Sequence, residues 1–131
     1  MITVIKSPFV QYKLTILRNK KTSNTVFRQT MNEISYLIAS DVLQYVPFKK
    51  QTIETPLKKM SGTALGQPII LVPILRAGLG LLEGFAKFLP EAEKGHIGLY
   101  RDEQTYEPVE YLFKLPRVKN KKAVSYTHLR A

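Results

Sequence analysis

Ile69-Ile70-Leu71-Val72-Pro73-Ile74-Leu75-Arg76-Ala77-Gly78-Leu79-Gly80 is the stretch of this chain that decides its fold. Its first four residues are apolar without alternation, so both faces of the strand that they form must be buried, as in the centre of a parallel sheet. Pro73 has no amide proton to give to a ladder, and we expect it to end this strand. Residues 74–78 then form a loop at the carboxyl end of the strand, where ligands bind in open α/β sheets.

A helix and a second strand follow this loop. Residues 96–100 are short and apolar, as the second strand should be. The helix between the two strands, which Pro90 ends, carries its apolar residues at helical spacing: Leu81, Leu82, Phe85 and Leu89. Strand, helix and strand make one βαβ unit, so the sequence predicts an α/β fold with a parallel sheet flanked by helices.

Two further helices are predicted in the first part of the chain. Ser7 as the cap and Pro8 in the first helical position are typical of a helix start, and this short helix ends near Arg18. After a polar break over 22–25, a longer helix runs to Pro47. Its apolar residues repeat at helical spacing and share one face: Phe27, Met31, Ile34, Ile38, Val42 and Tyr45.

The remaining patterned segments are predicted to be extended. Residues 51–57 and 64–68 are strand-like and flank a turn over 58–62. Residues 109–115 alternate with a period of two, which indicates an extended arm with one apolar side. Such an arm usually packs on another surface, and a second subunit is one candidate.

The composition restricts the class of protein. The chain has 131 residues, which fits one domain, and it contains no cysteine, which excludes disulfides and fits a reducing cytosol. The N-terminus is unlike a signal peptide, and the longest apolar run is too short to span a bilayer, so we expect a cytoplasmic protein with no membrane partner. The net charge of +10 allows a nucleic acid, a membrane surface or an anionic substrate as partner. Because the basic pairs are scattered and not interleaved with aromatics, a basic nucleic-acid-binding module is kept only as an alternative.

Arg76 and Arg101 are the candidate anion ligands, because each follows the carboxyl end of a predicted parallel strand. Neighbouring strand ends are close, and the planar fork of arginine suits phosphate through two parallel hydrogen bonds. Gly78 and Gly80 let the backbone approach a ligand, and the helix that follows offers free N–H groups at its start. On spacing alone, the alternative that both arginines are ordinary surface residues is equally open.

Other polar residues give weaker signals. His96 and His128 lack the spacing of a metal-binding pair. Asp102 and Glu103 are adjacent, so on an extended chain they point to opposite sides and make a poor catalytic pair. The sequence therefore predicts no catalytic residue and no metal ligand.

Three segments, Val72–Gly80, Leu99–Glu103 and Glu107–Val109, closely resemble uracil phosphoribosyltransferases, and the order and spacing match over residues 69–116. The resemblance implies the type I phosphoribosyltransferase fold, with a β-arm. It also implies a glycosyltransferase activity in pyrimidine salvage, in which uracil and phosphoribosyl pyrophosphate give UMP and pyrophosphate.

The resemblance further implies the site and the partners. Arg76, with Ala77 and Gly78 of its loop, would contact the pyrophosphate, and Arg101 would be the second contact. Magnesium would accompany the diphosphate, and the 109–115 arm would hold a homodimer together. The resemblance also suggests GTP as an activator of full-length family members. The residues of this chain neither indicate nor exclude such activation.

The last residues depart from the family. In the family a strand, here Lys122–Val124, leads into an acidic, glycine-rich loop for the ribose phosphate, and uracil is held nearer the C-terminus; residues 125–131 do not resemble that loop. We therefore expect residues 1–124 to be the N-terminal part of one phosphoribosyltransferase domain and 125–131 to be a non-family tail. The chain is then an incomplete fragment, inactive alone, and a phosphoribosyltransferase for another nucleobase stays open as an alternative.

Overall fold

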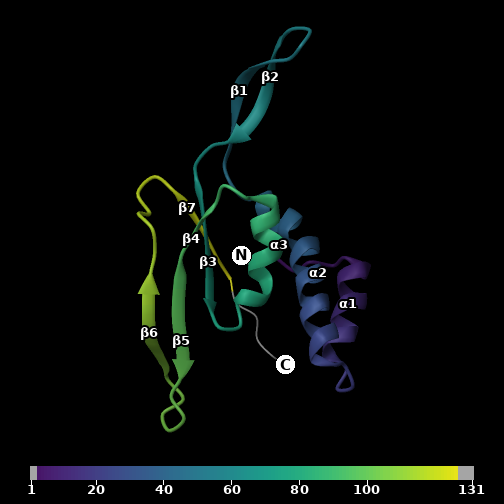
Figure 1. Ribbon diagram of the computed structural model, residues 1–131, viewed down its shortest axis with the longest axis vertical. Coiled ribbons are helices and arrows are strands. Elements are labelled where there is room, and N and C mark those ends of the chain that lie inside the picture. The colour runs from purple at the N-terminus through teal and green to yellow at the C-terminus, as the bar shows by residue number, and fades with distance from the viewer. Residues whose placement is uncertain (1–2, 127–131) are drawn as a thin grey trace.

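The computed structural model describes residues 3–126, which form an α/β fold. Three helices, α1 (Pro8–Arg18), α2 (Asn24–Leu43) and α3 (Leu79–Phe88), are stacked side by side. Helix α1 packs on α2, α2 packs on α3, and α3 packs on the central strand of a five-stranded sheet (Figure 1). Within the described range, no helix has the length and apolar character needed to cross a membrane.

The starts of the two N-terminal helices differ in their capping. Pro8 occupies the first turn of α1 as predicted, but the Ser7 side chain makes no capping hydrogen bond. Only the Ser7 carbonyl takes part, accepting from the Gln11 N–H at 3.1 Å. Helix α2 is capped by the Ser23 side chain, which accepts from the Val26 N–H at 3.3 Å. Ser7 is therefore the N-cap residue of α1 as predicted, but only the cap of α2 is closed by a side chain.

Helix α2 ends two residues earlier than its apolar pattern predicts. The Tyr45 and Val46 N–H groups bond to the carbonyls three residues back, so the chain tightens after Leu43. Pro47 disfavours the helical conformation in the residue before it, which accounts for this early end. Tyr45 consequently leaves the apolar face and is 58% exposed, while Val46 is buried in its place.

Strand β3 (Ile69–Leu75) is the centre of the sheet. It pairs in parallel with β7 (Lys122–Tyr126) on one side and with β4 (Glu93–Lys94) and β5 (His96–Arg101) on the other. The predicted βαβ unit, β3–α3–β5, is confirmed. Pro73, however, does not end β3: the ladder on the β4–β5 side is interrupted between Leu71 and Ile74, so a residue without an amide proton fits at this gap.

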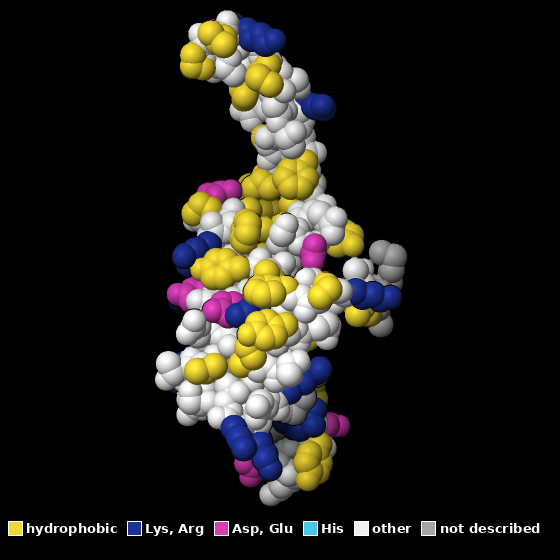
Figure 2. Space-filling model, turned by 90° about the vertical axis from the view of Figure 1, so that its right-hand side faces the viewer, with side chains coloured by type: hydrophobic (Ala, Val, Ile, Leu, Met, Phe, Trp, Pro, Cys, Tyr) yellow, Lys and Arg dark blue, Asp and Glu magenta, His cyan; other side chains and the backbone are white. Residues whose placement is uncertain are grey.

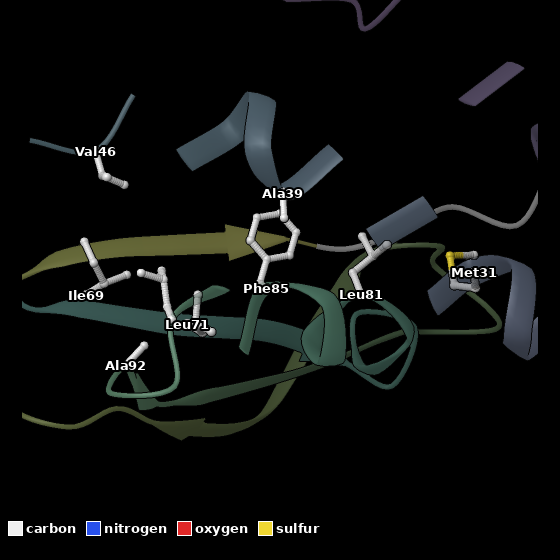
Figure 3. Close-up of a cluster of buried hydrophobic side chains, with 9 residues drawn as sticks. Met31, Ala39, Val46, Ile69, Leu71, Leu81, Phe85 and Ala92 are labelled. Carbon is white, nitrogen blue, oxygen red and sulfur yellow. The ribbon is translucent and has the colours of Figure 1, made fainter. Parts of the chain in front are cut away.

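The hydrophobic core lies between β3 and the helices. Ile69–Val72 are at most 3% exposed, as the unbroken apolar run predicts. Phe85 of α3 is 2% exposed, and Figure 3 shows its ring lying toward Ala39 of α2 and close to Leu71 of β3. The ring of Tyr126 on β7 stacks on Phe85 with 5.1 Å between the ring centroids. Burial of these apolar side chains holds α3 to the sheet and thereby fixes the loop between β3 and α3.

The segment predicted as an apolar arm is strand β6 (Pro108–Lys114), which pairs antiparallel with β5. The register shifts beside Gly98, and the Tyr111 ring lies against that glycine. This bulge breaks the period of two, so Phe113, paired with Ile97, falls on the other face of the sheet from Tyr111. The expectation of one continuous apolar side is therefore wrong, although the segment is extended as predicted.

The element that projects from the body is an antiparallel hairpin, β1 (Phe48–Glu54) and β2 (Lys59–Leu65) (Figure 1). Its turn lies at residues 55–58 and not at 58–62 as predicted. The Thr55 hydroxyl accepts from the Lys58 N–H at 3.1 Å and donates to the Lys58 carbonyl at 2.8 Å, which closes the turn early. Gly62 is consequently a strand residue opposite Gln51.

Candidate anion-binding site

The two predicted arginines lie at the carboxyl edge of the sheet. Leu75 of β3 is level with Gly98 of β5, so Arg76 directly follows one strand and Arg101 ends its parallel neighbour. Both side chains are exposed, and within residues 3–126 neither has a carboxylate within 4.0 Å. Neighbouring strands are about 4.8 Å apart and each residue adds about 3.3 Å, so the two arginines are within reach of a common ligand. Their convergence on one anion stays a prediction.

The start of α3 does not offer the free amides that the sequence predicts. The N–H groups of residues 78–81 donate in turn to the carbonyls of Ile74, Arg76, Ala77 and Gly78, at 2.8–3.3 Å. Consecutive tight turns therefore lead directly into α3 and use the amides that an anion would need. The amides of residues 78–81 are therefore not free to bind an anion at this edge.

Gly78 is buried, and its backbone is packed against protein. A Cβ atom at this position would lie 2.7 Å from the Ile74 nitrogen and 2.7 Å from the Tyr126 carbonyl oxygen. The residue must therefore be glycine because β3 and β7 press on it, a reason that sequence reasoning missed. Ala77 is half-buried beside it and does line a hollow.

That hollow, of about 410 Å³, lies between the loop after β3 and helices α2 and α3. Arg76 and Ala77 line it from the loop, Arg28 and Asn32 from α2, and Glu83 from α3. Arg101 does not line it. The structure thus brings Arg76 together with Arg28, which the sequence analysis did not select. Its signal in the sequence is an arginine next to the apolar face of α2.

Asp102 has a structural role beside Arg101. Its carboxylate accepts from the N–H groups of Thr105 at 2.8 Å and Gln104 at 2.9 Å, and the Thr105 hydroxyl adds a third bond. The hydrogen bond from the Thr105 backbone, with the help of the other two, holds the pKa of Asp102 below its usual value. The Asp102 carboxylate is thus engaged in closing the turn, which fixes the chain just after Arg101.

The basic side chains on one face of the molecule are dispersed. On the face shown in Figure 2, the lysine and arginine side chains are spread from the hairpin to the opposite end, without a continuous stripe. Of the two histidines, His96 is half-buried on β5, and His128 lies outside the described residues.

Known proteins resemble both the sequence and the fold. The sequence profile of the family described as uracil phosphoribosyltransferase matches residues 4–125. Uracil phosphoribosyltransferases of Levilactobacillus brevis and Lactiplantibacillus plantarum are 48% and 49% identical over 114 residues, 86% of this chain and 54% of each relative. The solved structure of the AQ2163 protein from Aquifex aeolicus is 30% identical, covers 97% of this chain and 62% of its own, and superposes with a TM-score of 0.87.

The chain therefore spans about half the length of the curated relatives that it matches. The profile nevertheless extends over nearly all of the described residues, from before α1 into β7. By sequence and by fold, the chain belongs to the uracil phosphoribosyltransferase family.

Proposed function

We propose that this chain supplies the diphosphate-binding part of an enzyme that transfers the phosphoribosyl group of phosphoribosyl pyrophosphate to uracil. The observation that carries the proposal is the position of Arg76. This exposed residue has no carboxylate partner within residues 3–126 and directly follows the central strand, at the edge where α/β folds bind ligands. Arg101 ends the parallel neighbour at the same edge. The membership of the family supplies the reaction.

The proposed role of the arginines follows from the charges of the reaction. The bond between the ribose carbon and the diphosphate oxygen breaks, and a bond from that carbon to a uracil nitrogen forms as this nitrogen loses its proton. The diphosphate leaves with additional negative charge. Positive side chains held at the leaving group stabilise this charge most in the transition state, so they accelerate the step. Ala77 and Gly78 carry the loop, and the tight packing of Gly78 keeps Arg76 in place.

Magnesium enters the proposal with the substrate. Within residues 3–126, no three His, Cys, Asp or Glu side chains gather as a metal site, and Glu83 is the one carboxylate that lines the hollow beside Arg76. This donor set fits an ion held mainly by phosphate oxygens and water, with at most Glu83 from this part of the chain, as magnesium commonly is. Such an ion would neutralise part of the diphosphate charge.

A homodimer through residues 109–115 belongs to the same proposal. Within the described residues β6 pairs only with β5, which leaves its other edge open, and Tyr111 and Phe113 are 53% and 61% exposed. An open edge and two exposed aromatic side chains suit a strand-to-strand contact with a second copy.

A cytoplasmic location is proposed on the absence of cysteine.

Substrate binding tests the proposal directly. Isothermal titration calorimetry of phosphoribosyl pyrophosphate with magnesium would be compared for the wild-type chain, Arg76→Gln and Arg101→Gln. The matched control is Arg117→Gln, which removes the same charge between β6 and β7, at the other end of β3. Loss of one charged hydrogen bond should weaken binding about tenfold in each of the first two variants, whereas the control should stay within about twofold. Unchanged affinity in both Arg76→Gln and Arg101→Gln would refute the assignment.

A further inference from the structure

Arg28 and Arg76 come from distant parts of the sequence and line one hollow. Arg28 is the fifth residue of α2, and Arg76 begins the loop between β3 and α3. The hollow has a volume of about 410 Å³ and also receives Asn32 and Glu83. Arg101, the other proposed contact, lies outside this lining. Arg76 thus shares the hollow with Arg28 of α2 and the carboxyl edge of the sheet with Arg101 of β5.

The charges of this hollow are unbalanced. Within residues 3–126, neither Arg28 nor Arg76 has a carboxylate within 4.0 Å. Glu83 lines the hollow, but its Oε2 accepts a hydrogen bond from the Asn32 side-chain amide at 2.5 Å and is held toward α2. Two guanidinium groups that share a hollow without an ion-paired carboxylate repel each other, and an anion relieves this repulsion.

Asn32, which lines the same hollow, carries a buried polar atom without a partner within residues 3–126. Its Oδ1 is buried and has no hydrogen-bond partner among the described residues. Buried polar atoms without partners are rare in folded proteins, and functional sites are one of the places where they occur. The atom belongs to a residue one helical turn beyond Arg28, on the same lining of the hollow.

We propose that Arg28 is a second cation of the Arg76 site and binds the same diphosphate group from the α2 side. This inference rests on the proposed function, because it assumes that Arg76 binds the diphosphate. Arg28 is then a binding residue that touches the substrate. Its planar fork can hold two phosphate oxygens at once, which a lysine at this position could not do. The diphosphate is gripped between a helix and the sheet edge, and not by the sheet edge alone.

The test uses inorganic pyrophosphate as the probe and the whole chain as the protein. Calorimetric titration would compare the wild-type chain with Arg28→Gln, Arg28→Lys, Arg76→Gln and the control Arg117→Gln. Arg28 is exposed, so the variants should fold, and circular dichroism melts would check this. We expect Arg28→Gln to weaken binding about tenfold and Arg28→Lys to restore only part of the loss, because lysine keeps the charge but not the fork. Arg117→Gln should bind like the wild-type chain.

The outcomes separate this inference from the function on which it rests. A loss in Arg76→Gln with normal binding in Arg28→Gln would overturn the role of Arg28 and leave the proposed function standing. No loss in either variant, or no pyrophosphate binding by the wild-type chain, would overturn both. A second measurement is protection from phenylglyoxal, which modifies arginine: pyrophosphate should protect Arg28 and Arg76 but not Arg117, as mass spectrometry of the peptides would show. Equal modification of Arg28 with and without pyrophosphate counts against the inference.

Discussion

Replacing Gly84 with alanine should force α2 and α3 apart. Gly84 lies against Ser35 where α3 packs on α2, and the Ser35 hydroxyl donates to the Leu81 carbonyl at the same place. A Cβ atom on residue 84 would lie 2.6 Å from the Ser35 Cβ and its carbonyl carbon, whereas ordinary contacts begin near 3.4 Å. The helices must therefore separate by about 0.8 Å in a core that is packed as densely as a crystal.

Two opposing effects set the size of the change. Alanine is better than glycine in a helix by about 1 kcal/mol. Overpacking costs about 1–3 kcal/mol, and the strained Ser35 hydrogen bond adds about 1 kcal/mol. The balance is a loss of about 1–3 kcal/mol in the free energy of unfolding of Gly84→Ala. The sign of the change in the free energy of unfolding decides between the two effects, because helix propensity alone predicts a more stable variant.

Urea unfolding followed by circular dichroism measures this loss. Gly62→Ala is the matched control: it makes the same chemical change in the exposed hairpin, where the nearest atoms to a new Cβ lie at 3.4–3.6 Å. We expect the control to change stability by less than about 0.5 kcal/mol. A Gly84→Ala variant as stable as the wild-type chain, or more stable, would refute the packing argument. Pyrophosphate binding is a second readout, since α2 and α3 carry opposite walls of the Arg28–Arg76 hollow.

Four further predictions follow from the same structure. Phe85→Ala should lower the free energy of unfolding by about 3–5 kcal/mol in urea titrations, because it empties the centre of the core. Burial raises the pKa of Tyr126, so stability should fall as the pH rises above about 10, where the unfolded tyrosine ionises first; Tyr126→Phe should abolish this fall in unfolding curves measured from pH 8 to 11. Phe113→Lys should shift any dimer to monomer in light scattering, because it places a charge on the open edge strand. The pKa of Asp102 is lowered, so the exchange protection of the Thr105 amide should be present above about pH 4 and lost as the pH falls through the pKa of the folded protein; in Asp102→Ala that protection should be absent at every pH.

Local patterns were enough to predict the centre of the fold. The unbroken apolar run at Ile69–Val72 must be buried on both faces of the strand that it forms, and it is the central strand of the sheet. The spacing of apolar residues on α2 and α3 likewise fixes which side packs inward. Arg76 could be placed at the carboxyl edge for the same reason: its position depends only on where the strand ends.

Features that depend on contacts between distant residues could not be predicted in this way. The bulge in β6 arises where the Tyr111 ring meets Gly98, which no period of residues 109–115 reveals. The sequence suggests that Gly78 is a glycine because a ligand approaches its backbone. In the structure the Tyr126 carbonyl of β7 lies too close to Gly78 to leave room for a Cβ atom. Arg28 joined the candidate site for a similar reason, because only the packing of α2 on α3 brings it beside Arg76.

The contact between Gly78 and β7 also determines when the anion site can form during synthesis. Arg76 emerges from the ribosome well before residues 122–126, so at first its loop lacks the strand that presses on Gly78. The nascent chain can build the α1–α2 pair from neighbouring residues, and β3 can pair on one edge with β4 and β5 soon after they emerge. Its other edge must wait for β7, more than fifty positions downstream. Until that partner arrives, one edge of the most apolar strand is open to chaperones and to other nascent chains.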